Sequence, residues 1–331
     1  MPEIILSESN QTLNALYGDF QAPIVSHIEE LCEAWQEQEI APLIFREQKI
    51  ETFAGGYTST TAMNDWAPVG ENGAHPSNGF QEGFSKIIQD MTWKSQFGVS
   101  QEMVEDQQLG RALKDTTKFV NSYYRTKERF FANLLGTAAT GGTSVTLNGK
   151  VFDATSADGL ALFHKEHKGK VSGKKMCNKF ADAFSGGAWG KMLTAYQNLE
   201  GENGEILGLC PDTLIIPNDT EMKDEAYAWV NSHNTPGSGN NDANPLYGNQ
   251  RIIVWPYLNQ FIGTAKPWFI MDSKFNAEAD GAVYQNRLDM VIRSVLGDND
   301  ENIWKGRARF AGGFVDWRCL MGGGMTGGST L

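Results

Sequence analysis

The chain has few cysteines, and they are far apart. The four among its 331 residues are Cys32, Cys177, Cys210 and Cys319. A disulfide framework or a zinc cluster normally needs cysteines at short, repeated spacings. We therefore expect four reduced thiols in a cytoplasmic product.

Positive charge is also scarce. Lys and Arg total 28 against 40 Asp and Glu, which gives a formal net charge of −12 at pH 7. Tight binding to nucleic acid depends on cationic side chains that release counterions from phosphates. We therefore do not expect this surface to bind DNA or RNA directly, although an acidic surface can face packed DNA without adhering to it.

Long apolar runs are missing. No stretch approaches the ~20 residues that a membrane-spanning helix needs. The first twenty residues, MPEIILSESNQTLNALYGDF, lack the basic region and apolar run of a signal peptide. We expect no membrane partner and no export signal.

Motifs of catalysis and cofactor binding are missing as well. There is no Gly-x-Ser-x-Gly elbow, and Gly186-Gly187 and Gly322-Gly323-Gly324 lack the Lys-Ser/Thr of a phosphate loop. His164 and His167 could share one side of a helical turn, but His-Lys-Glu-His is not the zinc motif His-Glu-x-x-His. The acidic run at 298–301 lacks the central glycine of a calcium loop. We expect no catalytic residue, no cofactor and no metal site.

What the sequence does contain is one long amphipathic helix. Between residues 101 and 137, apolar side chains recur at steps of four and seven, at Leu109, Leu113, Val120, Tyr124, Phe131 and Leu135. This spacing keeps one stripe on one face of a helix over 109–135. About 27 residues at about 1.5 Å each make a rod of about 40 Å, beyond the usual length of about 11 to 12 residues. Such a rod, with no catalytic residues around it, indicates an architectural protein rather than an enzyme.

The N-terminal region is predicted to be simpler. Residues 1–20 are polar and mixed, which suggests an extended arm. From Pro23 to Glu39, apolar residues at three- and four-residue steps predict a short amphipathic helix that Pro42 ends.

The segment from Phe53 to Phe84 differs from its surroundings. It combines eight glycines or prolines with strand-forming Thr and Tyr residues, and its flanks alternate apolar with polar side chains. We expect a long two-stranded excursion with a flexible tip. A two-stranded ribbon is marginal alone in water, so this one is expected to lean on a neighbouring molecule.

The second half of the chain is predicted to be an α/β segment. Asn148-Gly149 marks a hairpin, and the pattern from Trp189 to Leu199 predicts a helix. A buried strand ends at Pro217, and a helix capped by Asp219 follows to about residue 231. Composition predicts a loop over 232–249, and the remaining expected strands lie at 251–255, 268–271, 304–310 and 313–318.

Aromatic residues are numerous: nine Trp, nine Tyr and eighteen Phe. Several lie in the glycine-rich excursion, where the core of a monomer cannot easily absorb them, and exposed aromatics point to interfaces. The predicted inter-subunit residues are Phe53, Tyr57, Trp66, Phe80 and Phe84.

The order of these elements resembles the major capsid proteins of tailed bacteriophages, which have the HK97-like fold, and in particular the Mu-like prophage major head subunits. Phe97-Gly98-Val99-Ser100-Gln101-Glu102-Met103-Val104-Glu105-Asp106 looks like the strand that enters the spine helix. Leu162-Phe163-His164-Lys165-Glu166-His167 is similar to a Leu-Phe-x-x-x-His stretch of the Mu-like subunits, although Lys168 replaces the asparagine that often follows. The strand 211–217 resembles the entry to an axial domain, and the run 268–317 the return from it.

The resemblance implies an α+β, HK97-like fold. Its expected parts are an N-terminal arm with a short helix at 1–47, an extended β-hairpin loop at 48–97, a peripheral domain with the spine helix at 98–204 and 296–331, and an axial α/β domain at 205–295.

The implied function is structural. Copies of the chain would form the hexamers and pentamers of an icosahedral phage shell around double-stranded DNA, without sequence-specific binding. A separate scaffolding protein and a portal would be its other partners, and the product would be a virion protein assembled in the host cytoplasm.

Three alternatives stay open. An encapsulin-type nanocompartment shell protein shares the implied fold. A metal-dependent hydrolase would use His164, His167 and a carboxylate. A phage tail or base-plate protein is less favoured, because the long helix and the α/β middle are atypical there.

Overall fold

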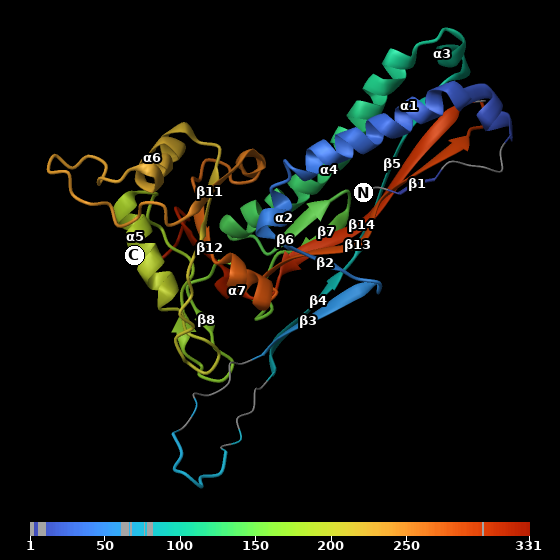
Figure 1. Cartoon of the computed structure of the whole chain (residues 1–331). Coiled ribbons are helices and arrows are strands. Elements are labelled where there is room, and N and C mark those ends of the chain that lie inside the picture. Colours follow the sequence, from blue (N-terminus) through green and yellow to red (C-terminus); the bar gives the residue numbers. More distant parts are fainter. Residues whose placement is uncertain are drawn as a thin grey trace. The chain divides into compact units, whose positions relative to one another are not determined.

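The computed structural model describes residues 3–5, 11–60, 66, 68–75, 77, 82–299 and 301–331 (Figure 1). The chain forms two compact units. The first comprises residues 1–55, 88–131 and 284–312, and the second comprises residues 56–87, 132–283 and 313–331.

Helices occur in both units. Their bounds are α1 Gln11–Gln36, α2 Ala41–Ile44, α3 Gln101–Glu105, α4 Leu109–Ala139, α5 Gly186–Gln197, α6 Thr220–Asn231 and α7 Ser273–Glu278, with short 3-10 helices η1 at Pro256–Gln260 and η2 at Trp317–Cys319. Among the described residues, no helix is both long enough and apolar enough to cross a bilayer.

The strands of the N-terminal half are β1 Glu3–Ile5, β2 Arg46–Lys49, β3 Ala54–Thr60, β4 Glu82–Gln89, β5 Met91–Val99, β6 Ser144–Leu147 and β7 Lys150–Asp153. Those of the C-terminal half are β8 His167–Lys168, β9 Lys175–Met176, β10 Thr213–Pro217, β11 Arg251–Trp255, β12 Trp268–Met271, β13 Ala282–Leu296, β14 Asn302–Phe314 and β15 Leu320–Gly323.

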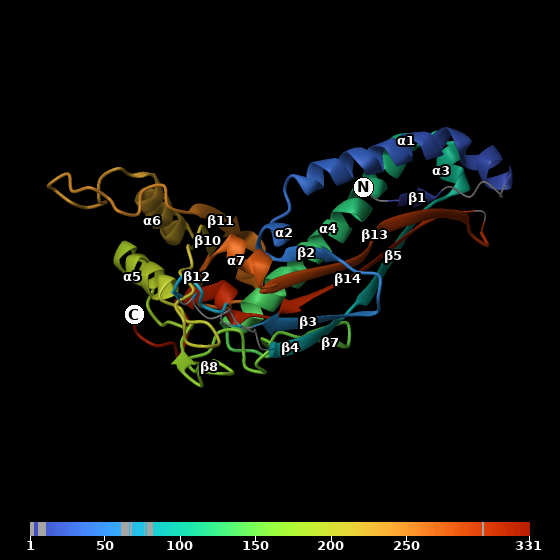
Figure 2. The same ribbon diagram turned by 60° about the horizontal axis from the view of Figure 1, so that its bottom comes forward.

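The first unit is a helix layer on a sheet. The sheet has the strand order β1-β13-β14-β5, and β2 also pairs with β13. Figure 2 shows α1 and α4 side by side over one face of β13, β14 and β5. The core between the layers contains Phe20, Ile24, Ile28, Cys32, Val99, Ala112, Phe119, Val120, Tyr124, Met290, Ile292 and Trp304.

The long helix is confirmed, and it is slightly longer than predicted. The apolar stripe indicated 109–135, and α4 runs to Ala139. Val120, Phe131 and Leu135 on that stripe are fully buried. Gly141 follows the helix with a φ of 87°, a left-handed conformation that suits a helix end and that glycine adopts without strain.

One N-terminal expectation was wrong: the extended arm was placed over residues 1–20, but α1 already begins at Gln11. The helix predicted over 23–39 is confirmed as the later part of α1, which ends at Gln36. The helix continues through Pro23. Proline in a helix interior loses one hydrogen bond, but Phe20, Ile24, Ile28 and Cys32 form one buried stripe, and tertiary packing of such a stripe outweighs local propensity.

The excursion is confirmed only in part. Strands β3 and β4 form a two-stranded sheet. The segment after them, predicted to belong to the same ribbon, instead forms β5, which pairs antiparallel with β14 from Met91↔Phe310 to Val99↔Asn302. The reason is packing, because Trp93 stacks on Phe310 and Phe97 stacks on Trp304 within that sheet.

The second unit contains a four-stranded sheet with the order β11-β10-β12-β15. All five residues of β10 are buried. Asp219 caps α6 by accepting a hydrogen bond from the Met222 backbone N–H at 3.1 Å. The predicted strands at β10, β11 and β12 and the helix at α6 are confirmed.

Two turns show how local sequence sets the chain path. Asn148 and Gly149 have φ values of 48° and 74° between β6 and β7, which confirms the predicted hairpin. The expected strands at 304–310 and 313–318 are instead one strand, β14, followed by η2. Asp316 ends the strand by accepting a hydrogen bond from the Arg318 backbone N–H. The fold class is α+β, as predicted.

Candidate functional site

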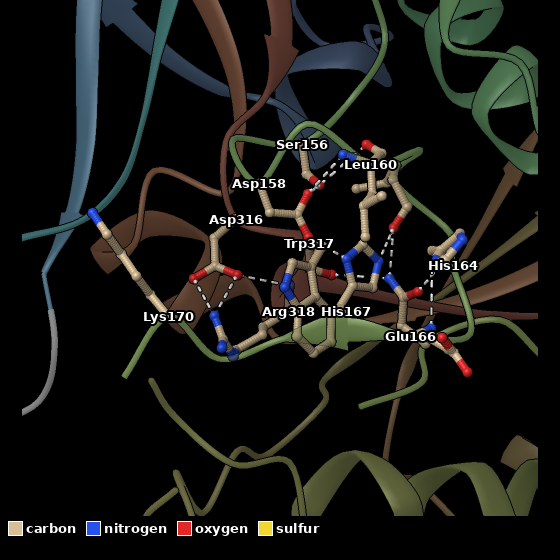
Figure 3. A network of polar contacts seen from close by, with 12 residues as sticks. Ser156, Asp158, Leu160, His164, Glu166, His167, Lys170, Asp316, Trp317 and Arg318 are labelled. Atoms are coloured by element: carbon tan, nitrogen blue, oxygen red, sulfur yellow. Dashed lines mark hydrogen bonds and ion pairs between the residues drawn. The ribbon is translucent and has the colours of Figure 1, made fainter. Parts of the chain in front are cut away.

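The histidines singled out in the sequence lie in a network of polar contacts in the second unit (Figure 3). His167 belongs to the short strand β8, which pairs with β9. Asp158 lies in the turn before it, where its Oδ1 accepts hydrogen bonds from the Ser156 hydroxyl at 2.5 Å and from the Leu160 backbone N–H at 3.1 Å. The hydrogen bonds within this turn therefore fix the position of the Asp158 carboxylate, independently of its contact with His167.

Both ring nitrogens of His167 face acceptors. Nδ1 lies 2.6 Å from Asp158 Oδ2, and Nε2 lies 3.2 Å from the Leu162 carbonyl oxygen. The His167 residue is fully buried. The Asp158 carboxylate accepts, so Nδ1 donates to it, whereas the Leu162 carbonyl oxygen also accepts a hydrogen bond from Asn178 Nδ2. Both ring nitrogens are thus directed at oxygen atoms of the protein.

The neighbours of Asp158 lower the pKa of its carboxyl group. Burial alone would raise the pKa of this carboxyl, but the hydrogen bonds from His167 and Ser156 outweigh it, so the pKa lies below its usual value. The side chain is only 4 % exposed. Asp158 and His167 therefore form a buried pair joined by a hydrogen bond.

Asn178 connects this segment to the C-terminal part of the unit. Its Oδ1 accepts from the His164 backbone N–H at 2.9 Å, and its Nδ2 donates to the Leu162 carbonyl at 2.8 Å. The same Nδ2 lies 3.2 Å from the carbonyl oxygens of Trp317 and Leu320. One fully buried amide thus contacts backbone groups from two chain segments, 162–164 and 317–320.

Trp317 links the histidine pair to a buried arginine. The His167 ring stacks on it with 4.3 Å between centroids and 4° between planes, and the Arg318 guanidinium carbon lies 4.6 Å from its ring centroid. Arg318 Nη1 donates to Glu202 Oε1 at 2.9 Å and lies 3.4 Å from both Asp316 carboxylate oxygens. Burial would lower the pKa of Arg318, but these carboxylates raise it.

This arrangement has the features of a structural clamp. Within the described part of the chain, no group of three or more His, Cys, Asp or Glu side chains could hold a metal ion. His164 Nδ1 accepts from the Glu166 backbone N–H at 3.1 Å, so it is used locally. His164 and His167 lie together, with 5.7 Å between ring centroids, but they do not present a ligand set.

The glycine clusters serve packing. A Cβ on Gly323 would lie 2.5 Å from the Trp268 ring, and one on Gly186 would lie 2.0 Å from Trp229. Both distances are too short for any other residue. Part of the acidic run at 298–301 lies outside the described residues.

The structure places the predicted inter-subunit aromatics in different environments. Trp66 is 92 % exposed and Phe53 is 56 % exposed. Phe84 is half-buried, with Lys170 Nζ 5.7 Å from its ring centroid. Tyr57 is buried, and burial raises its pKa to about 12. Phe80 lies outside the described residues.

The sequence reading missed a basic groove in the first unit. Lys94, Arg287, Arg293, Lys305, Arg307 and Arg309 line a hollow of about 670 Å³ on the sheet, together with the single carboxylate Glu3. A sequence pattern that indicates this groove is Trp304-Lys305-Gly306-Arg307-Ala308-Arg309-Phe310. Cationic residues alternate there with apolar or small ones, which places the charges on one face of a strand.

Comparison with known proteins gives one family. The model of a family described as phage capsid protein matches residues 85–321. Among curated protein sequences, nothing matches this chain.

Several solved phage structures resemble the chain at low identity. A chain of Microbacterium phage Oxtober96 is 11% identical, with 87% of this chain and 90% of that chain covered and a TM-score of 0.49. The capsid of Ralstonia phage GP4 is 10% identical, with 85% and 86% covered and a TM-score of 0.49. The procapsid of bacteriophage JBD30 is 13% identical, with 93% and 74% covered and a TM-score of 0.46.

Proposed function

Because the chain belongs to the phage capsid protein family, we propose that it is a major capsid subunit whose copies form the hexamers and pentamers of an icosahedral head. The observation that carries this proposal is the exposure of Trp66 and Phe53, at 92 % and 56 %. Large aromatic side chains left in water are unusual for a monomer and typical of surfaces that a partner covers.

The ribbon supports the same proposal. Within the described ranges, strands β3 and β4 pair only with each other, and two strands alone are marginal in water. A neighbouring subunit would supply the missing apolar surface. In this proposal, the ribbon of β3 and β4 within residues 48–97 extends across a neighbour, and residues 98–204 and 296–331 form the peripheral domain together with β5 and β13, with which β14 forms one sheet. The remainder of residues 205–295 forms the axial domain, and residues 1–47 are the N-terminal arm.

The other partners belong to the same proposal. The shell would enclose double-stranded DNA without reading its sequence, as the net charge of −12 favours. A separate scaffolding protein and a portal would take part in assembly, which would occur in the host cytoplasm before the chain becomes part of the virion. The subunit would perform no catalysis.

A phage head is favoured over the encapsulin alternative by the family match. The hydrolase alternative would need His167 as a metal ligand, and its two nitrogens already face Asp158 and Leu162. The network around His167 therefore favours a stabilising role within the subunit.

The test is assembly. We would express the chain alone and together with its scaffolding protein, and examine both preparations by negative-stain electron microscopy and light scattering. Closed shells, tubes or rings of five and six subunits are expected. A monodisperse species of 36.5 kDa in both preparations would contradict the proposal.

A further inference from the structure

The basic groove lies on the face of the first unit's sheet that the helices leave uncovered. Trp304, Ala308 and Phe310 of β14 are buried, whereas Lys305 and Arg307 between them are exposed. Successive side chains of a strand point to opposite faces. Since Trp304 belongs to the core under α1 and α4, Lys305 and Arg307 lie on the opposite side of the sheet.

Most of the positive charge in this groove is not neutralised. Asp90 is 2 % exposed and pairs with two of the six cations, Arg287 at 3.3 Å and Arg309 at 3.1 Å. The other four, Lys94, Arg293, Lys305 and Arg307, are exposed. None of these four has an ion partner among the described residues.

The strand register brings like charges together. Lys94 on β5 is directly opposite Arg307 on β14. Like charges at such positions destabilise a sheet, so the arrangement costs the subunit stability. On a chain with a net charge of −12, a groove with six cations and one carboxylate is suited to an anionic partner.

The excursion has the complementary charge. Between Lys49 and Lys86 the sequence contains four carboxylates and no Lys or Arg. Three of these carboxylates, Glu51, Glu71 and Glu82, belong to described residues and are exposed. The same segment carries Trp66, and the face of a tryptophan ring attracts an arginine guanidinium.

We propose that the groove of Lys94, Arg293, Lys305 and Arg307 is the surface on which the acidic excursion of a second copy docks, through Glu71, Glu82 and Trp66. This inference rests on the proposed function and specifies the receiving surface. Complementary charge at such a contact speeds encounter, fixes register and excludes wrong partners. It also makes assembly sensitive to salt, because the screening length falls to about 3 Å at 1 M.

Charge-swap variants test the contact. Lys305→Glu/Arg307→Glu reverses the groove, and Glu71→Lys/Glu82→Lys reverses the excursion. Each is expected to raise the subunit concentration needed for assembly at least about tenfold, since attraction becomes repulsion. Combining all four substitutions in one chain restores complementarity and the net charge of −12, and is expected to restore assembly.

Mixing separates contacts between copies from contacts within one copy. A 1:1 mixture of the two charge-reversed proteins contains complementary groove and excursion surfaces only on different molecules. Particles or capsomers in the mixture, but in neither protein alone, would support docking between copies. Recovery in the combined chain without recovery in the mixture would contradict it.

A matched control tests whether the excursion, rather than another acidic surface, docks in the groove. Glu33→Lys/Glu37→Lys reverses two exposed carboxylates, one on α1 and one directly after its end, with the same change in net charge. Rescue of the reversed groove by this control pair would overturn the inference. So would a Lys305→Glu/Arg307→Glu variant that assembles normally but has lost a salt-dependent binding to double-stranded DNA that the wild type shows. If wild-type protein formed no oligomers, the proposed function itself would fail instead.

Circular dichroism and urea unfolding show that each variant is folded before assembly is compared. Lys305→Gln/Arg307→Gln provides a milder version of the groove change. It should reduce assembly less than charge reversal does, and it should weaken the dependence of assembly on salt. A salt dependence equal to that of the wild type would count against the groove.

Discussion

Asp158 keeps a negative charge where water is nearly excluded. Its two oxygens receive hydrogen bonds from Ser156, the Leu160 backbone and His167. Removing a carboxylate from water is costly unless its hydrogen-bonding positions are filled by the protein. The turn around Asp158 fills them, so the pair holds the segment before β8 in one conformation.

Breaking this pair is expected to destabilise the subunit strongly. Asp158→Asn should reduce the free energy of unfolding by about 1–3 kcal/mol, because it removes a charge-assisted hydrogen bond to a buried side chain and leaves buried polar groups without suitable partners. Urea unfolding of the unassembled subunit measures the loss. Glu166→Gln is the control in the same segment: its partner Lys175 is 53 % exposed, and such surface pairs contribute little to stability. Equal losses in the two variants would contradict the clamp.

The same carboxyl predicts a dependence of stability on acid. The pKa of Asp158 is lower in the folded chain than its usual value, so the unfolded chain binds the proton first as the pH falls. Its contribution is present above an unfolded pKa of about 3.9 and is lost as the pH drops through the folded value. Below pH 4 the wild type should therefore lose stability more steeply than Asp158→Asn. Parallel unfolding curves between pH 5 and pH 2 would exclude this role.

The sequence identified His164 and His167 as neighbours but could not assign their role. Spacing alone allows a metal site, a buried ion pair or two surface residues. The partners that decide between these, Asp158, Asn178 and Trp317, come from a preceding turn and from distant segments. Only the tertiary fold brings them to the histidine, so no local pattern could have named them.

Among the elements, α4 and β14 fit closely. Phe119 on the helix lies over Gly306 on the strand, where an added Cβ would be 2.5 Å from the end of the phenylalanine ring. The glycine lets the helix approach the sheet, and protein cores do not absorb extra volume without strain.

Gly306→Ala should therefore destabilise the first unit by about 1–3 kcal/mol through overpacking. Gly110→Ala, near the start of α4, has open space around its Cβ position and should be neutral or stabilising by less than about 1 kcal/mol. Thermal or urea unfolding of the two variants gives the comparison. A loss for Gly110→Ala equal to that for Gly306→Ala would show that the contact with Phe119 does not cause the effect.

Element prediction succeeded where one face of an element is buried. The stripe from Leu109 to Leu135 located α4, and Asp219 located the start of α6. It failed where contacts with residues far away in the sequence determine the element. Examples are α1, which runs through Pro23, and β5, which pairs with β14 in one sheet. In both cases the stabilising contacts lie more than 80 residues away in sequence, as between Trp35 and Asn121.

At the scale of the whole molecule, the net charge of −12 hides an uneven distribution. Opposite signs gather on different surfaces: cations in the groove on the sheet, and carboxylates along the excursion. A contact between two different patches is heterologous, and repetition of such a contact closes into rings when its rotation permits. The total charge led us to expect no direct binding to nucleic acid and gave no sign of the groove, because summing over the chain discards the position of each charge.

Exposed aromatics should matter for assembly and not for folding. Trp66→Ala and Phe53→Ala remove side chains that are 92 % and 56 % exposed, so each should change the free energy of unfolding by less than about 0.5 kcal/mol. If a neighbour buries Trp66, its truncation should cost about 2 kcal/mol of association, roughly a 30-fold rise in the concentration required for assembly. Val151→Ala, at a residue 65 % exposed on β7, is the control and should change neither. Light scattering across a concentration series measures assembly, and normal assembly of Trp66→Ala would remove this tryptophan from the interface.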